Sequence, residues 1–158
     1  MKIEEKIIKN LVENRKVISS WGSYMYISKK ERCITYFIIK TLSDKEMKKN
    51  ELFPLVMNAV DTYIDGVIDK QKVKSINYCS DLKNDPKLCW LIRRNADGTY
   101  HREYLTKREL RTLILCLIPT FLRIRTKPIL GGIGLIHRLS LSKYGQGLYN
   151  FWFKKEDK

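Results

Sequence analysis

The chain is poor in the residue types that build metal centres and covalent cross-links. Its 158 residues include two histidines and four cysteines, and no two cysteines form a CxxC pair. The neighbours of Cys33, Cys79, Cys89 and Cys116 are mainly apolar or strand-like, which is typical of buried, reduced thiols. A structural zinc site is therefore not expected, and we predict no metal and no cofactor.

Long apolar segments are also missing. The longest apolar run, residues 113–122, is interrupted by Pro119 and Thr120 and is too short to span a bilayer. The N-terminal segment, MKIEEKIIKNLVENRK, is charged and amphipathic, unlike a signal peptide. We therefore expect a cytoplasmic protein that has no membrane partner.

Acidic residues are scarce beside basic ones, with 17 Asp and Glu against 31 Lys and Arg and a net charge of +14. The excess is densest in residues 101–158, which hold twelve basic and four acidic residues. Because each neutralised phosphate releases condensed counterions, this surplus favours a polyanionic partner, above all nucleic acid. A basic protein whose charge serves only solubility is the alternative. The 44% of hydrophobic residues is enough for a folded core.

The clearest local pattern is the stretch 88–110. Asp97-Gly98 is typical of a hairpin turn between two short strands. Thr106, three residues before Glu109 and directly ahead of an apolar run, indicates a capping box at the start of a helix. Basic residues lie on both arms of the hairpin, in this helix and beyond it. The predicted nucleic-acid-binding residues are Arg93, Arg94, Arg102, Lys107, Arg108, Arg111, Arg123, Arg125 and Lys127.

Apolar periodicity and capping residues predict the other elements. Ser28 and Glu31 form a second capping-box pattern, and Pro54 is expected to separate two helices. The expected elements are helices over 2–16, 29–42, 44–53, 54–70 and 107–122, a strand over 136–141, and an aromatic-rich helix from about Ser142 to Phe153. Between them, residues 129–134 (ILGGIG) are expected to form a flexible connector.

This succession of helices and a hairpin resembles the winged helix-turn-helix family of DNA-binding regulators. Residues 104–109, YLTKRE, are similar to the strand-to-helix junction that closes the wing in that family. A second candidate junction, residues 139–145 (LSLSKYG), has Gly145 where many members carry glycine. The resemblance implies an α+β fold, mostly helical with a β-hairpin, winged-helix-like, plus N- and C-terminal helices. The segments it implies are 1–28 (N-terminal helix and connector), 29–127 (winged-helix-like domain) and 128–158 (C-terminal strand–helix extension).

The resemblance places the recognition element on residues 54–70. Its base-reading candidates are Asn58, Thr62, Lys70 and Lys72. One face of the same helix carries Asp61, Asp65 and Asp69. Because carboxylates repel phosphates, the groove-facing surface is then expected to be the wing and the basic residues after it.

The leading hypothesis is a non-catalytic double-stranded DNA-binding protein, with a role in transcription regulation and no catalytic residues. The alternative is a small protein-interaction module, an inhibitor or adaptor that acts on a nucleic-acid-handling enzyme. A nuclease that uses the three aspartates with a metal, or His101 and Tyr100 as acid and base, is a third hypothesis. A solvated helix face and ordinary hairpin residues explain these side chains more simply. A homodimer through the N- or C-terminal helix is also considered.

Overall fold

The structure is a computed structural model of the 158-residue chain. It describes residues 2–18, 22–71, 92–94, 96–97, 100–102, 105–128 and 135–154. Of residues 29, 64–71, 92–94, 100–102, 127–128 and 135–136, only the backbone is described.

Helices and antiparallel strands alternate along the chain, in agreement with the expected α+β class. The helices are α1 (Ile3–Asn14), α2 (Lys29–Thr41), α3 (Lys49–Gln71), α5 (Lys107–Leu117), α6 (Lys143–Tyr149) and the π-helical turn η1 (Asn150–Lys154). The strands are β1 (Lys16–Ile18), β2 (Tyr24–Tyr26), β3 (Met47–Lys48), β4 (Ile92–Arg94), β5 (Tyr100–Arg102), β6 (Leu122–Pro128) and β7 (Leu135–Leu141). None of the described helices is long and apolar enough to cross a membrane.

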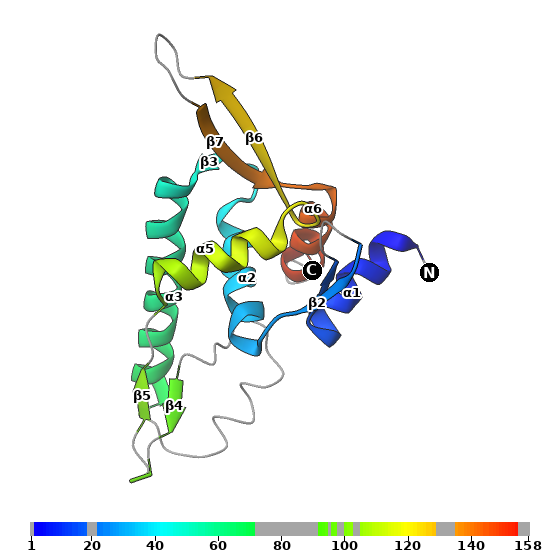
Figure 1. The fold of residues 1–158 in the computed structure, drawn as a ribbon. Coiled ribbons are helices and arrows are strands. Elements are labelled where there is room, and N and C mark those ends of the chain that lie inside the picture. Colours follow the sequence, from blue (N-terminus) through cyan, green and yellow to red (C-terminus); the bar gives the residue numbers. More distant parts are fainter. Residues whose placement is uncertain are drawn as a thin grey trace.

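The largest described sheet has the strand order β3–β7–β6, and all its pairs are antiparallel. β6 and β7 pair over their whole length, from Leu122 opposite Leu141 to Pro128 opposite Leu135. The expected strand near residues 136–141 is confirmed as β7, whereas β6 was not predicted. Its cations Arg123, Arg125 and Lys127 alternate with Leu122, Ile124 and Thr126, which is the spacing of a strand, but the segment was interpreted as a basic run. Figure 1 shows this hairpin projecting from one end of the helical body.

One hydrophobic core joins the N- and C-terminal elements to the middle of the chain. It contains Leu11 of α1, Ile38 of α2, Val56 of α3, Leu113 of α5 and Leu148 of α6, each fully buried. The segment boundary expected between residues 127 and 128 falls inside the β6–β7 hairpin. The aromatic C-terminal helix docks on this core, since Trp152 is buried and its ring lies 5.4 Å from that of Tyr36.

The prediction that Pro54 separates two helices was wrong, because α3 runs unbroken from Lys49 to Gln71. Proline removes one backbone hydrogen bond, here the one to the carbonyl of Asn50. Both residues are exposed and lie near the helix start, so water can satisfy that carbonyl. Leu52 and Val56, both fully buried, hold the helix to the core on either side of the proline.

The predicted hairpin around Asp97 is confirmed as the antiparallel pair β4–β5, with Arg93 opposite His101. This hairpin forms its own two-stranded sheet. In Figure 1, β4–β5 lies at the end of the molecule opposite the β6–β7 hairpin. The cations predicted on the two hairpins therefore belong to two separate regions of the backbone.

Candidate nucleic-acid interface

Helix α5 begins at a capping box, as the sequence predicted. The backbone N–H of Glu109 donates to Thr106 Oγ1 at 3.1 Å, and the backbone N–H of Thr106 donates to Glu109 Oε1 at 3.3 Å. Leu110, Leu113 and Leu117 form a stripe that is fully buried. Because that stripe faces the core, the opposite side of α5 faces solvent.

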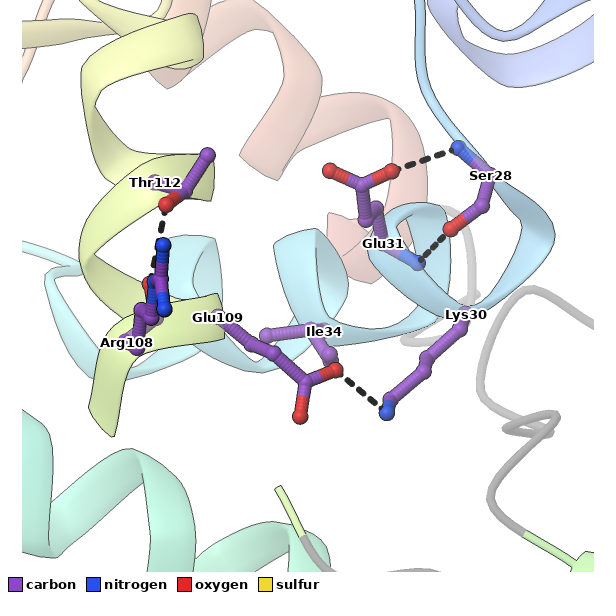
Figure 2. A pocket seen from close by; sticks show the side chains of 7 residues that line it. All are labelled: Ser28, Lys30, Glu31, Ile34, Arg108, Glu109 and Thr112. Atoms are coloured by element: carbon purple, nitrogen blue, oxygen red, sulfur yellow. Dashed lines mark hydrogen bonds and ion pairs between the residues drawn. The ribbon is translucent and has the colours of Figure 1, made fainter. Parts of the chain in front are cut away.

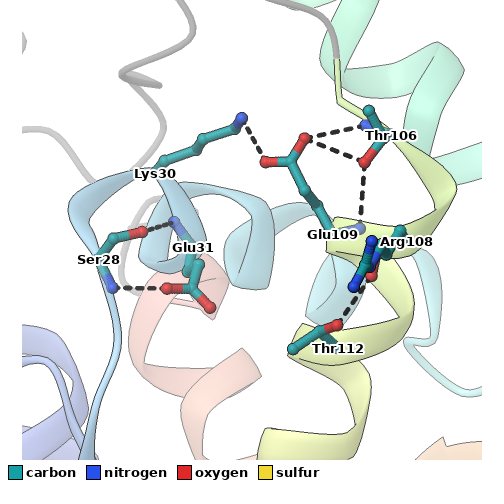
Figure 3. A network of polar contacts seen from close by, with 7 residues as sticks. All are labelled: Ser28, Lys30, Glu31, Thr106, Arg108, Glu109 and Thr112. Carbon is teal, nitrogen blue, oxygen red and sulfur yellow. Dashed lines mark hydrogen bonds and ion pairs between the residues drawn. The ribbon is translucent and has the colours of Figure 1, made fainter.

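A second contact fixes the first turn of α5 to the first turn of α2. Lys30 Nζ lies 2.5 Å from Glu109 Oε2, as Figure 3 shows. Burial raises the pKa of the Glu109 carboxyl. The hydrogen bonds from Lys30 and Thr106, together with the charge of Lys30, outweigh that effect and leave the pKa below its ordinary value. The carboxylate is therefore ionised at neutral pH and engaged by its neighbours.

A small open cavity of about 280 Å³ lies between these two helix starts. Figure 2 shows Ile34 beside the contact of Lys30 with Glu109, and the capping pair of Ser28 and Glu31 above Lys30 at the start of α2. The two glutamates in its wall each cap a helix. The arrangement serves to hold α2 and α5 together, and it sets the position of the outward face of α5.

The solvent-facing side of α5 carries three of the predicted cations. Lys107, Arg108 and Arg111 are exposed. Thr112 and Leu115, one and two turns further along, continue the same exposed stripe. Glu109 is the single acidic residue of this helix, and Lys30 engages its carboxylate. The outer face of α5 is therefore cationic, with no uncompensated acid from its own sequence.

The surroundings of α5 in the sequence reinforce this charge. From residue 105 to residue 154 the chain has nine Lys and Arg residues and one acidic residue, Glu109. This segment forms α5, β6, β7, α6 and η1, and it includes the β6–β7 hairpin. This third of the chain therefore contributes a single carboxylate of its own, while Glu46 from another segment lies against Arg125.

The β3–β7–β6 sheet places cations side by side on one face. Lys48 of β3 pairs with Arg138 of β7, which in turn pairs with Arg125 of β6. Arg123 is exposed and lies two residues before Arg125, on the same face of β6. Glu46 offsets part of this charge, since its Oε1 lies 2.6 Å from Arg125 Nη2. Like charges on directly opposed strand positions destabilise a sheet, so this row favours binding of an anion.

The predicted cations fall into three groups in the structure. Lys107, Arg108 and Arg111 lie together on α5, and Arg123, Arg125 and Lys127 lie on β6. The third group, Arg93, Arg94 and Arg102, lies on β4 and β5. The side chains of that third group and of Lys127 lie outside the described residues.

Sequence reasoning missed Arg138 and Lys48. The alternation of Leu135, His137, Leu139 and Leu141 with the residues between them would have placed Arg138 on the polar face of a strand. No local signal identifies Lys48, because β3 has two residues and owes its place to pairing with β7.

Both junctions that the sequence singled out are strand-to-helix transitions with a side-chain cap. The first leads from β5 into α5 through Thr106. The second leads from β7 into α6, where the backbone N–H of Gly145 donates to Ser142 Oγ at 3.1 Å. A Cβ atom at Gly145 would lie 2.1 Å from the carbonyl oxygen of Phe121, so glycine is needed for this close approach.

The base-reading candidates and the aspartate stripe lie on α3. Asn58 and Thr62 are exposed and line an open cavity between α3 and the end of α2. The side chain of Lys70 and all of Lys72 lie outside the described residues, as do the side chains of Asp65 and Asp69. Within the described part of the chain, no group of three His, Cys, Asp or Glu residues is placed to hold a metal ion.

Two sequence expectations remain, the buried, reduced state of the four cysteines and the acid–base pair of Tyr100 and His101 on the hairpin. Cys33 is buried, and Cys116 is partly buried with a free thiol. Burial and, secondarily, the charge of Glu31 raise the pKa of Cys116, which lowers its reactivity. The side chains of Tyr100 and His101, and the whole of Cys79 and Cys89, fall outside what the structure describes.

Comparison of the chain with protein-family models, curated proteins and solved structures found no match. The functional argument therefore depends on the charge and geometry of the chain itself.

Proposed function

We propose that this protein binds double-stranded DNA without catalysis, in the manner of a transcriptional regulator. The observation that carries the proposal is the outer face of α5. Lys107, Arg108 and Arg111 are exposed there, while the one carboxylate of the helix is turned to Thr106 and Lys30. A helix with this charge fits the major groove, which admits an α-helix between two rows of phosphates.

In this arrangement α5 is the groove-entering helix, in place of the segment 54–70 that the resemblance indicated. Its first turns carry the cations, and the N-terminal residues of recognition helices are the ones that contact base edges. Thr112 and Leu115 extend the exposed stripe, so they are the candidates for contacts with bases.

The β6–β7 hairpin is the wing of this proposal, in place of β4–β5. It follows α5 directly in the chain, is seven residues long on each arm and projects beyond the helical body, as Figure 1 shows. The cations Arg123 and Arg125 on its polar face are placed to contact the phosphate backbone. The close approach of Gly145 to Phe121 joins the base of this hairpin to α6. A cytoplasmic location is part of the same proposal.

A binding titration against a labelled DNA duplex across a salt series tests the proposal. We expect affinity to fall steeply as ionic strength rises, because phosphate contacts release counterions. Arg111→Ala should weaken binding and lower the magnitude of the salt slope by about one. Lys6→Ala, which removes an exposed cation of α1, is the matched control. It should change neither the affinity for the duplex nor the salt slope. Absence of duplex binding at low salt, or equal losses in both variants, would overturn the proposal.

One observation favours a protein partner as the second candidate function. Leu115 is 58% exposed and lies one turn beyond Arg111 on the outer face of α5, so the cationic face ends at an exposed apolar side chain. In that case α5 would engage an acidic surface of a nucleic-acid-handling enzyme. Capture from a nuclease-treated lysate, repeated with Leu115→Ser, separates the two candidates. A stoichiometric partner that survives nuclease and is lost in the variant would favour the adaptor.

A further inference from the structure

The β1–β2 ribbon presents two tyrosines on its outer face. Lys16 pairs with Tyr26 and Ile18 pairs with Tyr24, so all four side chains lie on one side of the ribbon. Val17, on the other side, is 1% exposed and belongs to the core. Tyr24 is 49% exposed and Tyr26 is 72% exposed. The ribbon therefore buries one face and leaves a pair of aromatic rings in solvent.

The ammonium group of Lys16 lies close to both rings. Lys16 Nζ is 5.7 Å from the ring centroid of Tyr24 and 5.5 Å from that of Tyr26. Such contacts are worth about 0.5–1 kcal/mol at exposed sites, and they hold the ammonium group near both rings. Beside this ammonium group Tyr24 stays about half exposed and Tyr26 mostly exposed. The result is an aromatic surface with a fixed positive charge.

This surface continues into an open cavity of about 540 Å³. Ile18, next to Tyr24 on the outer face, lines its edge, and Thr120 Oγ1 donates to the Ile18 carbonyl at 2.8 Å. That bond ties the ribbon to the turn between α5 and β6. The other walls include Arg123 and Lys143, both exposed.

A third ring, that of Tyr144, also lines the cavity. Among the described residues that line it, none is Asp or Glu. The outer face of the ribbon and the cavity that Ile18 borders thus hold three tyrosines and three cations, namely Tyr24, Tyr26, Tyr144, Lys16, Arg123 and Lys143. Aromatic rings beside a groove of positive charge are the combination with which proteins hold unpaired nucleic-acid strands.

We propose that the β1–β2 ribbon and the adjoining cavity bind a single-stranded nucleic acid, with unpaired bases stacked on Tyr24 and Tyr26. The two rings stand two residues apart on a strand, about 6.6 Å along it, so each can hold a base of its own. Lys16, Arg123 and Lys143 contact the phosphates. This site lies away from the outer face of α5 and shares Arg123 with the proposed wing, so its test uses Tyr26 and Lys143, to which the duplex proposal gives no role.

The test is fluorescence anisotropy of a labelled oligo-dT strand with the full-length protein and three variants. Tyr26→Ala should weaken binding roughly 5- to 150-fold, the effect of losing one stacked base, whereas Tyr26→Phe should keep it. Lys143→Ala should weaken binding moderately and reduce its salt dependence. Because Tyr26 is mostly exposed, the alanine variant should unfold at the wild-type temperature.

Duplex binding, measured on the same proteins, separates this inference from the proposed function. Tyr26→Ala should leave duplex affinity unchanged, and Arg111→Ala should reduce it. If duplex binding is absent and oligo-dT binding still depends on Tyr26, the ribbon site stands and the duplex proposal falls. Equal oligo-dT affinity in the wild type and Tyr26→Ala, or no oligo-dT binding, would overturn the ribbon site. If Tyr26→Ala loses a bound protein but keeps its affinity for oligo-dT, the ribbon contacts a protein partner, and the single-strand proposal is overturned.

Discussion

Lys30 Nζ and Glu109 Oε2 lie 2.5 Å apart and join the first turns of α2 and α5, although the two residues are 79 positions apart in the chain. The lysine side chain is 20% exposed and the glutamate side chain 41% exposed, so water screens the pair only in part. The contact has two effects on α5. It anchors the helix start to α2, and it neutralises the one carboxylate of a helix that otherwise presents cations.

The lowered pKa of Glu109 predicts a dependence of stability on pH. Since the pKa lies lower in the folded than in the unfolded protein, the carboxylate stabilises the fold at neutral pH. That contribution is lost as pH falls below the ordinary value of 4.5 and through the folded-state pKa. Glu109→Gln should therefore be less stable than the wild type at neutral pH, and the difference should shrink in acid.

Urea denaturation of both proteins at neutral pH and at a pH well below 4.5 measures this effect. Glu13→Gln is a suitable control, because Glu13 lies 4.0 Å from Lys9 in an exposed pair and should matter little at either pH. A destabilisation by Glu109→Gln that is equal at both pH values would contradict the assignment.

The capping box of α5 predicts a loss of stability when its hydroxyl is removed. Thr106→Ala leaves the N–H of Glu109 without its acceptor and should lower the free energy of unfolding by about 0.5–2 kcal/mol. Thr106→Ser keeps an oxygen at the same position and should stay within a few tenths of a kcal/mol of the wild type. Thermal unfolding followed by circular dichroism compares the three proteins. A serine variant as unstable as the alanine variant would show that the cap contributes little.

Two glycines should respond differently to alanine. At Gly145 the new Cβ would lie 2.1 Å from the carbonyl oxygen of Phe121, and neither backbone segment can yield easily, so a loss of about 3 kcal/mol or more is expected. Gly22 has a φ of +82° and open space around it, so alanine there costs only the strained backbone, about 1–2 kcal/mol. Chemical denaturation ranks the two variants. The reverse order would refute the close approach at Gly145.

The row of cations across the sheet predicts opposite effects on stability and binding. Arg138→Gln removes the central charge between Lys48 and Arg125, and it should raise the free energy of unfolding by about 0.2–1 kcal/mol. The same variant should bind a DNA duplex more weakly. Arg125→Gln also loses its ion pair with Glu46, so its gain in stability should be smaller.

Unfolding and duplex titrations on these two variants provide the measurement. A variant Arg138→Gln that is less stable than the wild type would mean that the row is not repulsive in the folded protein.

Local patterns in the sequence determined most of the helices and their caps. The pairs Ser28–Glu31 and Thr106–Glu109 form the capping boxes that their spacing predicts, because a cap involves residues within one turn. The Asp97 turn likewise identified β4–β5, since a two-strand hairpin is a local structure. The sequence also predicted the exposed cations of α5. Because Leu110 and Leu113 recur at helical spacing and face the core, the cations on the opposite side of the helix face solvent.

Tertiary structure decided the features that depend on distant segments. The continuity of α3 through Pro54 depends on burial of Leu52 and Val56 in a core that the whole chain builds. The strand β3 exists because it pairs with β7, about 90 residues later, and that pairing alone brings Lys48 beside Arg138. Local propensity specifies contacts within a turn or a hairpin, whereas sheet order and ion pairs between helices depend on how the core closes.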